Sequence, residues 1–224
     1  MYARIVPFAL YMVFIGLDEA LRYLASAGYI ALTADSFLLL YPLKIAAVIT
    51  ALWYFRKDYS ELRWNDLSQW KFTLFSTITG IVVFVLWIHM TWPFAVFGTL
   101  NGYDPTSLQG GTARIAVIAS RLVGAAMVVP IMEEFFWRSF IVRYIMKPEF
   151  EQVQVGTFTI ASFTISAVLF GFEHNLWLAG IMAGAGYNFV LYQTKSIAQC
   201  ILAHAVTNGA LGVYILLTQS WYFW

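Results

Sequence analysis

The stretch Ala113–Ile145 reads ARIAVIASRLVGAAMVVPIMEEFFWRSFIVRYI and is mostly apolar. A membrane-spanning helix needs about 20 predominantly apolar residues, so this stretch by itself predicts a chain that resides in a bilayer. The whole composition agrees, because 61% of the 224 residues are apolar and only 11% are charged. Soluble domains are roughly 45–50% apolar and about 25% charged. The composition therefore excludes a water-soluble globule, a disordered chain and a coiled coil.

Hydropathy divides the chain into seven apolar segments joined by short connections. Backbone polar groups inside lipid must be satisfied within the protein, and no alternating barrel pattern is present in the sequence, so helices are expected. The sequence thus predicts an all-α, polytopic transmembrane helix bundle of about seven spans, with room for an eighth, in a single domain over residues 1–224. The predicted spans are Ile5–Ala25, Ser36–Phe55, Phe72–Trp92, Ala113–Ile145, Thr157–Glu173, Leu176–Tyr192 and Ile197–Trp221.

Basic residues orient the predicted bundle. Lys and Arg gather in the connections Arg56–Lys71 and Arg143–Lys147 and at Lys195, whereas Pro93–Thr112 contains neither. Since short cytoplasmic connections are enriched in Lys and Arg, the N-terminus is expected to be cytoplasmic.

The overall charge and the cysteine count narrow the partners and cofactors. The net charge is +1, which gives no reason to expect a nucleic-acid partner. We expect membrane lipid and a membrane-associated protein or peptide instead. Cys200 is the only cysteine, so an intrachain disulfide framework and a cysteine-rich metal site are excluded.

Three ionisable residues lie deep in the fourth predicted span, where a charge costs about 2.5–3.5 kcal/mol. Helical spacing places Glu134 and Arg138 on one face, where they can pair, and turns Glu133 away from that pair. One carboxylate is thereby neutralised, and the other is left to accept a proton from water as a general base. A buried ion network that fixes helix packing is the alternative, but it leaves Glu133 without a partner.

Two further predicted spans contribute polar side chains. Phe170 and His174 share a face at the end of the fifth span, and His204 and Asn208 share a face inside the seventh. Taken alone, each is explained as a hydrogen-bonded residue between helices. Together with Glu133 they form an acid, two imidazoles and an amide, the usual content of a hydrolytic site.

Two other ionisable residues near span ends are expected to take no part in this site. Glu173 is rotated by about 100° from His174 at a helix end, which predicts a solvated carboxylate. His89, near the outer end of the third span, is expected to be interfacial.

The ordered motifs Glu133-Glu134-x-x-x-Arg138, Phe170-x-x-x-His174 and His204-x-x-x-Asn208 resemble the signature of the CPBP family, the CAAX proteases and bacteriocin-processing enzymes. Type II CAAX prenyl endopeptidases are the best-known members. The resemblance covers about residues 113–208, the expected catalytic core. The run Pro130–Arg143 also resembles a bacterial subgroup found beside exosortase sorting systems, which implies a bacterial inner membrane.

This resemblance implies an intramembrane endopeptidase that hydrolyses a peptide bond of a membrane-associated or lipidated protein. Glu133 would be the base, and His174 would help to hold the attacking water. His204 and Asn208 would stabilise the oxyanion of the tetrahedral intermediate. Glu134, Arg138 and Phe170 would have supporting roles.

The metal dependence of such a site stays open at this point. The family is commonly classed as metalloproteases, and Glu133, His174 and His204 could ligate a divalent metal such as zinc. Activation of water by Glu133 and His174 without a metal needs the same residues and is slightly favoured, since the sequence lacks His-Glu-x-x-His.

A second reading comes from a different functional class. The chain could be a non-proteolytic membrane immunity or assembly factor in which the polar set is a structural network. A proton-coupled transporter is a third reading, but it would require discontinuous helices in two related halves, which the sequence does not show.

Overall fold

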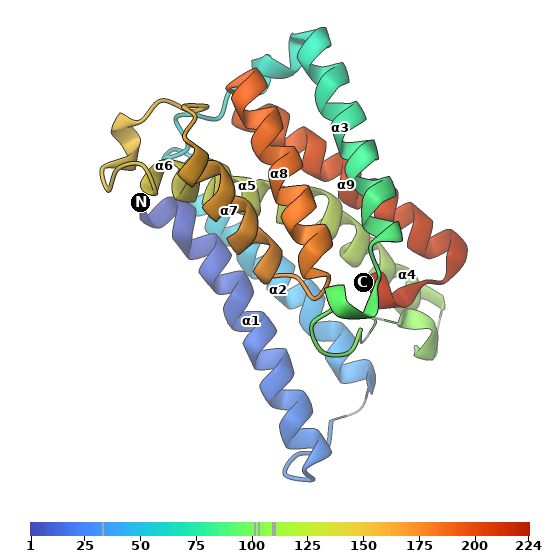
Figure 1. Ribbon diagram of the computed structural model, residues 1–224. Helices are drawn as coiled ribbons and strands as arrows, with labels where there is room; N and C mark the ends of the chain where they lie inside the picture. Colours follow the sequence, from blue (N-terminus) through green and yellow to red (C-terminus); the bar gives the residue numbers. More distant parts are fainter. Residues whose placement is uncertain (33, 101, 103, 109–110) are drawn as a thin grey trace.

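The computed structural model describes residues 1–32, 34–100, 102, 104–108 and 111–224, and over these residues it contains helices and no strand (Figure 1). The predicted all-α membrane bundle is confirmed. The helices are α1 Tyr2–Ser26, α2 Ala34–Tyr54, α3 Trp70–His89, α4 Gly111–Val123, α5 Val129–Glu134, α6 Val142–Tyr144, α7 Ile160–Phe172, α8 Trp177–Thr194 and α9 Ile197–Thr218. Short 3-10 helices cover Trp64–Ser68, Pro93–Ala95, Pro105–Ser107, Phe150–Gln152 and Trp221–Phe223.

Each predicted span coincides with a helix of the structure. Within the described part of the chain, four helical stretches are long and apolar enough to cross a membrane, and α7 is a shorter apolar helix. These four are Ser36–Tyr54, Trp70–His89, Gly111–Tyr144 and Ile197–Thr218. The count of seven spans therefore stays a prediction for α1, α7 and α8.

The stretch Gly111–Tyr144, called the fourth helix below, is continuous but irregular. Two π-helical segments, Gly124–Val128 and Phe135–Ile141, flank the short regular helix α5. Pro130 at the start of α5 lacks the N–H that an unbroken α-helix would use, which favours such a local change of winding. Glu133 and Glu134 are thus presented at the end of α5, between the two irregular segments.

Small residues let neighbouring helices approach closely. A Cβ added at Gly80 of α3 would lie 2.4 Å from the carbonyl oxygen of Ala203 in α9. A Cβ added at Gly171 of α7 would lie 2.7 Å from the carbonyl oxygen of Trp177, at the start of α8. Lipid tails are as apolar as the helices, so the hydrophobic effect does not drive helices together inside a bilayer. Close packing of backbones at small residues stabilises their association instead. In Figure 1, α3 accordingly runs beside α9, and α7 beside α8.

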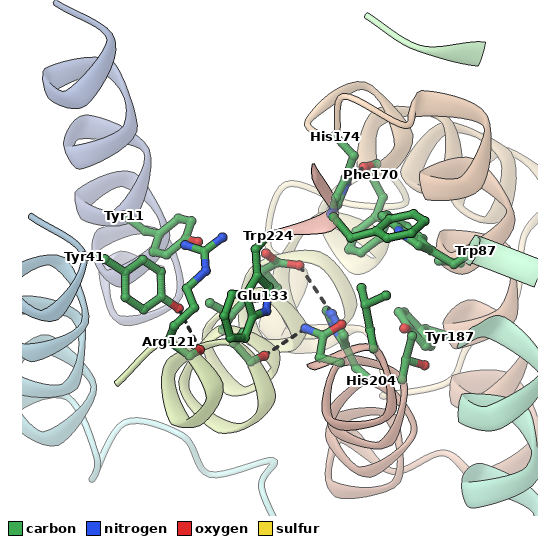
Figure 2. A pocket seen from close by; sticks show the side chains of 17 residues that line it. Tyr11, Tyr41, Trp87, Arg121, Glu133, Phe170, His174, Tyr187, His204 and Trp224 are labelled. Carbon is green, nitrogen blue, oxygen red and sulfur yellow. Dashed lines mark hydrogen bonds and ion pairs between the residues drawn. The ribbon is translucent and has the colours of Figure 1, made fainter. Parts of the chain in front are cut away.

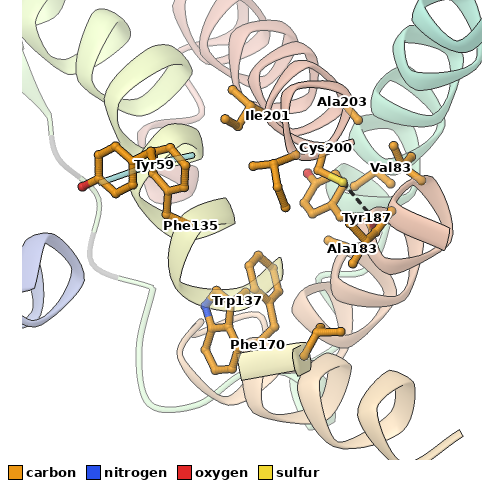
Figure 3. Packing of buried hydrophobic residues seen from close by; sticks show 14 of the residues in the cluster. Tyr59, Val83, Phe135, Trp137, Phe170, Ala183, Tyr187, Cys200, Ile201 and Ala203 are labelled. Carbon is orange, nitrogen blue, oxygen red and sulfur yellow. Dashed lines mark hydrogen bonds between the residues drawn. The ribbon is translucent and has the colours of Figure 1, made fainter. Parts of the chain in front are cut away.

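A buried core joins the fourth helix to α7, α8 and α9 (Figure 3). The rings of Trp137 and Phe170 meet edge to face at 5.9 Å, and those of Phe170 and Tyr187 at 6.0 Å. Cys200 is buried beside them, and its Sγ lies 3.8 Å from the carbonyl oxygen of Tyr187. The close packing of these rings keeps the neighbouring polar side chains, described in the next subsection, in fixed positions.

A group of charged and polar residues connects the N-terminal part of α1 to the fourth helix through hydrogen bonds. We call Arg4, Glu61, Ser139 and Arg143 the N-terminal charge cluster. Arg4 donates to both carboxylate oxygens of Glu61, at 2.9 and 2.7 Å, and to Ser139 Oγ at 3.1 Å. Arg143 donates to the same Ser139 Oγ at 2.9 Å, and Ser139 also donates to Glu61. The cluster therefore connects α1, the segment after α2, and the last turns of the fourth helix.

Candidate active site

A cavity of about 180 Å³ lies inside the bundle, and all three sequence motifs reach it (Figure 2). Glu133, His174, His204 and Asn208, the four residues predicted to be catalytic, all line it. A water molecule occupies about 30 Å³ of liquid, so the cavity has room for several waters. Other lining residues include Tyr11, Tyr41, Trp87, Arg121, Phe170, Tyr187 and Trp224.

The charged residues of the fourth helix are arranged as their spacing predicts. Arg138 Nη1 donates to Glu134 Oε1 at 3.2 Å, and both side chains are fully buried, with exposed fractions of 1% and 0%. The second guanidinium nitrogen donates to the carbonyl oxygen of Gly184 in α8 at 3.1 Å. Glu133 lies apart from this pair, and its Oε2 is buried with no hydrogen-bond partner. The structure thus has one neutralised carboxylate beside one that is available.

His204 is positioned by Glu134, a contact that sequence reasoning missed. Its Nδ1 lies 2.8 Å from Glu134 Oε1, and its ring stacks on Tyr187 with the centroids 4.6 Å apart. An ionised carboxylate only accepts hydrogen bonds, so Nδ1 carries a proton. Nε2 lies 3.8 Å from Glu133 Oε2, and Figure 2 shows the two side chains facing one another. Only the doubly protonated ring therefore presents an N–H donor on the Nε2 side.

His174 has the opposite arrangement. Its Nδ1 lies 2.8 Å from the carbonyl oxygen of Phe170, which only accepts, so Nδ1 carries a proton and the neutral ring keeps a lone pair on Nε2. The ring is confined by Phe170, with centroids 4.9 Å apart, and by Trp87 at 5.4 Å. His174 lies just after α7, which begins at Ile160 rather than at the predicted Thr157. Nε2 can accept a proton from water or ligate a cation.

Asn208 and His204 reach the cavity from the same face of α9. Asn208 Nδ2 donates to the carbonyl oxygen of Ala125 at 2.9 Å, within the first π-helical segment of the fourth helix. One of its two N–H groups is used in this way, and the other remains for a ligand. His89, in contrast, is exposed and contacts the carbonyl oxygen of Val85 in its own helix.

The prediction for Glu173 is wrong. Its side chain is only 11% exposed, and the indole Nε1 of Trp137 lies 3.1 and 3.2 Å from its two oxygens. Ligand atoms of Glu133, Glu173 and His174 all lie within 4.8 Å of one another. The prediction from helical rotation failed because the indole N–H of Trp137, from a distant segment, donates to the Glu173 carboxylate inside the protein. Nothing in the local sequence around Glu173 indicates that contact.

These donors fit a divalent cation in chemical type. Two carboxylates and one imidazole nitrogen are an ordinary set for a borderline transition metal, and the unpartnered Glu133 Oε2 is suited to such an ion. The predicted ligand set differs in one member. Among the described residues, the group within mutual reach contains Glu173 in place of His204.

Residues 115–210 match the family model described as type II CAAX prenyl endopeptidase Rce1-like. The match covers somewhat less than half of the chain, and over these residues the chain is similar to the Rce1-like family. The matched segment contains all three motifs, and it confirms the resemblance to the CPBP family while leaving the exosortase-associated subgroup unconfirmed. No curated protein and no solved structure matched the chain. The Rce1-like family implies a protease, and with four apolar helices of spanning length the protein is an integral membrane protein.

Proposed function

We propose that this Rce1-like protein is an intramembrane endopeptidase that hydrolyses a peptide bond of a membrane-associated or lipidated protein. The observation that carries the proposal is the buried Glu133 oxygen, which has no hydrogen-bond partner and belongs to a side chain lining a cavity with room for several waters. A structural carboxylate at such a position would be paired. A general base has to be accessible to water and close to a second acceptor, and His174 Nε2 supplies that acceptor.

The proposed reaction follows from these positions. Glu133 takes a proton from a water molecule held against His174, and the resulting hydroxide attacks the scissile carbonyl carbon. The tetrahedral oxyanion accepts hydrogen bonds from the protonated Nε2 of His204 and from the remaining N–H of Asn208. The C–N bond then breaks, and the proton on Glu133 passes to the leaving amine. Glu134 keeps Nδ1 of His204 protonated and, through Arg138, anchors the fourth helix to α8.

A divalent cation bound in this cavity would supply Lewis-acid polarisation of the carbonyl oxygen. The steps above need only groups of this chain. We further propose that the enzyme lies in a bacterial inner membrane with a cytoplasmic N-terminus, because its basic connections then share the cytoplasmic side. The substrate need not carry a prenyl group.

A comparison of protein termini in membrane fractions tests this function. Cells producing the wild-type protein are expected to contain new termini that cells producing Glu133→Ala lack. Glu149→Ala, which removes an exposed carboxylate with a 60% exposed side chain, is the matched control and should give the wild-type pattern. If the folded Glu133→Ala protein generates the same termini as wild type, the proposal is wrong.

The second candidate is a non-proteolytic immunity or assembly factor. The observation in its favour is the burial of Glu134, Arg138 and His204 in one hydrogen-bonded network, as expected for a structural element. Thermal unfolding separates the two functions. A structural network predicts that Glu133→Ala and His204→Ala unfold the bundle, whereas an active site predicts that Glu133→Ala leaves stability unchanged or slightly raised.

A further inference from the structure

The side chains of Glu133, Glu173 and His174 form a compact group at one end of the cavity, although they come from two separate parts of the chain. Their ligand atoms all lie within 4.8 Å of one another. Glu133 and Glu173 each offer a carboxylate oxygen. His174 Nδ1 lies 3.9 Å from Glu173 Oε1 and donates to the carbonyl oxygen of Phe170, so the lone pair of the neutral ring is on Nε2. The group therefore contains three convergent donors of the kinds that bind transition metals.

The local charge favours a cation at this point. Arg138 is directed to Glu134 and to the carbonyl oxygen of Gly184, and the positive group nearest to Glu133 Oε2 in the proposed reaction is His204, whose Nε2 lies 3.8 Å away. The other two carboxylates, of Glu133 and Glu173, lie close together in a largely buried place, where like charges repel strongly. The indole N–H of Trp137 hydrogen-bonds Glu173 but carries no net charge. Glu133 Oε2 is buried, without a hydrogen-bond partner, on a side chain that lines the cavity.

We propose that Glu133, Glu173 and His174 hold one divalent transition-metal ion, with Trp137 orienting the Glu173 carboxylate. Glu173 thereby replaces His204 in the ligand set that the sequence predicts, because His204 is held by Glu134 through Nδ1 and lies outside the compact group. Trp137 stands where an outer hydrogen-bond donor to a ligating carboxylate is commonly found.

The consequence for activity rests on the proposed function. A cation bound to Glu133 occupies the carboxylate that would otherwise take the proton from water, and the other two carboxylates of the site are engaged by Trp137 and by Arg138. Filling the site therefore removes the general base. The Lewis-acid polarisation that the ion would supply does not replace this proton acceptor, so hydrolysis slows. The metal-free protein is the faster enzyme.

Binding of Co²⁺ tests the ligand set without any assay of proteolysis. The full chain is purified in detergent, stripped with a chelator and titrated with Co²⁺, with visible absorption and calorimetry as readouts. One equivalent should bind. Glu173→Gln should weaken binding at least tenfold, and Trp137→Phe should weaken it about 10- to 100-fold, as removal of outer-shell partners does.

Two variants serve as controls. Glu149→Gln makes the same chemical change as Glu173→Gln on an exposed side chain and should bind Co²⁺ as the wild type does. His204→Asn should retain the ion, because His204 is not a ligand in this set. Circular dichroism and gel filtration show whether each variant is folded, and Glu173→Asp gives a milder second test at the same position.

The opposite results would overturn the inference. These are no saturable Co²⁺ binding by the wild type, unchanged binding by folded Glu173→Gln, or loss of the ion in folded His204→Asn but not in Glu173→Gln. In the activity assay, Zn²⁺ or Co²⁺ should lower turnover, and a faster loaded enzyme contradicts the inhibitory role. If no proteolysis is found at all, the proposed function fails while the binding result still decides the cation site.

Discussion

Two buried groups of charged residues lie on the same fourth helix, and they differ in how completely their polar atoms are paired. In the N-terminal charge cluster, Arg4 and Glu61 are bound through two hydrogen bonds, and Ser139 bridges them to Arg143. No buried side-chain nitrogen or oxygen of this cluster lacks a partner in the described structure. By contrast, an unpartnered buried atom remains on Glu133, which lines the cavity, and on its neighbours Glu134 and Arg138.

This difference matters more than burial itself. Arg4 and Glu61 are about as buried as Glu133, with side chains only 5% and 7% exposed. In a fully paired cluster, hydrogen bonds and ion pairs offset the free energy of removing the charges from water. No polar group is left free to bind a ligand or to react. The cavity keeps polar atoms unsatisfied, which is destabilising unless water, substrate or a cation completes them. The comparison supports a structural role for the first cluster and is consistent with the proposed catalytic role of the second.

The largest expected effect distinguishes the two clusters by activity. Glu133→Gln should lower the rate of peptide hydrolysis by about 10²- to 10⁴-fold, the usual contribution of a general base. Stability should be unchanged or slightly raised, because an unpartnered buried carboxylate is removed. Hydrolysis by protein reconstituted in vesicles, measured beside thermal unfolding, checks both expectations. If Glu133→Gln loses stability together with activity, Glu133 stabilises the fold and the proposed role as general base is wrong.

The next largest effect is on stability and concerns the buried ion pair of Glu134 and Arg138. Arg138→Met removes the counter-charge of Glu134 and should cost about 3–5 kcal/mol of unfolding free energy, as expected when a buried pair loses one partner. The matched control is Arg22→Met, because Arg22 also pairs at i,i+4 with an acid, Asp18, but at the surface with 53% of its side chain exposed. That change should cost about 0–1 kcal/mol. Equal costs in denaturant unfolding would contradict the importance of the buried pair.

A smaller effect tests the packing that carries His204 to the cavity. Gly80→Ala places a methyl group against the backbone of α9, where relief requires the helices to separate, and should cost about 1–3 kcal/mol. Gly16→Ala, in α1, adds a methyl group where no atom lies within 4 Å and should be neutral or stabilising by up to about 1 kcal/mol. Thermal unfolding of the two variants checks the opposite signs.

The smallest effect is the pH dependence of the N-terminal charge cluster. Burial acts to raise the pKa of Glu61, but hydrogen bonds from Arg4 and Ser139 and the charge of Arg4 outweigh it and lower this pKa below its ordinary 4.5. A lowered pKa in the folded state means that Glu61 stabilises the protein above its unfolded pKa and that this contribution is lost as the pH falls through the folded value.

Unfolding midpoints measured from neutral to acidic pH check this prediction. The wild type should lose stability on acidification below the ordinary glutamate range, and Glu61→Gln should lose less over the same range. Glu149→Gln provides the control with an exposed acid and should follow the wild type. An identical pH response of wild type and Glu61→Gln would show that the cluster does not depend on the ionised carboxylate.

Predictions made from local patterns agree with the structure for the helices and for the Glu134–Arg138 pair, but not for Glu173, which is predicted to be solvated and has a side chain only 11% exposed. The positions of the long apolar helices follow from hydropathy, and the pairing of Glu134 with Arg138 follows from helical spacing within one segment. The convergence of Glu133, His174, His204 and Asn208 on one cavity could be expected from the motifs but not located by them. The actual distances depend on the two π-helical segments, which no simple periodicity shows.

That this protein is a membrane-embedded helical bundle, and which residues in its spans are polar, can be predicted from the amino-acid order, because hydropathy and the helical repeat are properties of neighbouring residues. Three contacts could be known only from the folded chain: Glu134 with His204, Trp137 with Glu173, and Arg4 with Ser139. Each of these contacts joins segments more than 30 residues apart. Such contacts depend on how the helices cross and how closely glycines let them approach, and this is settled by packing rather than by local pattern.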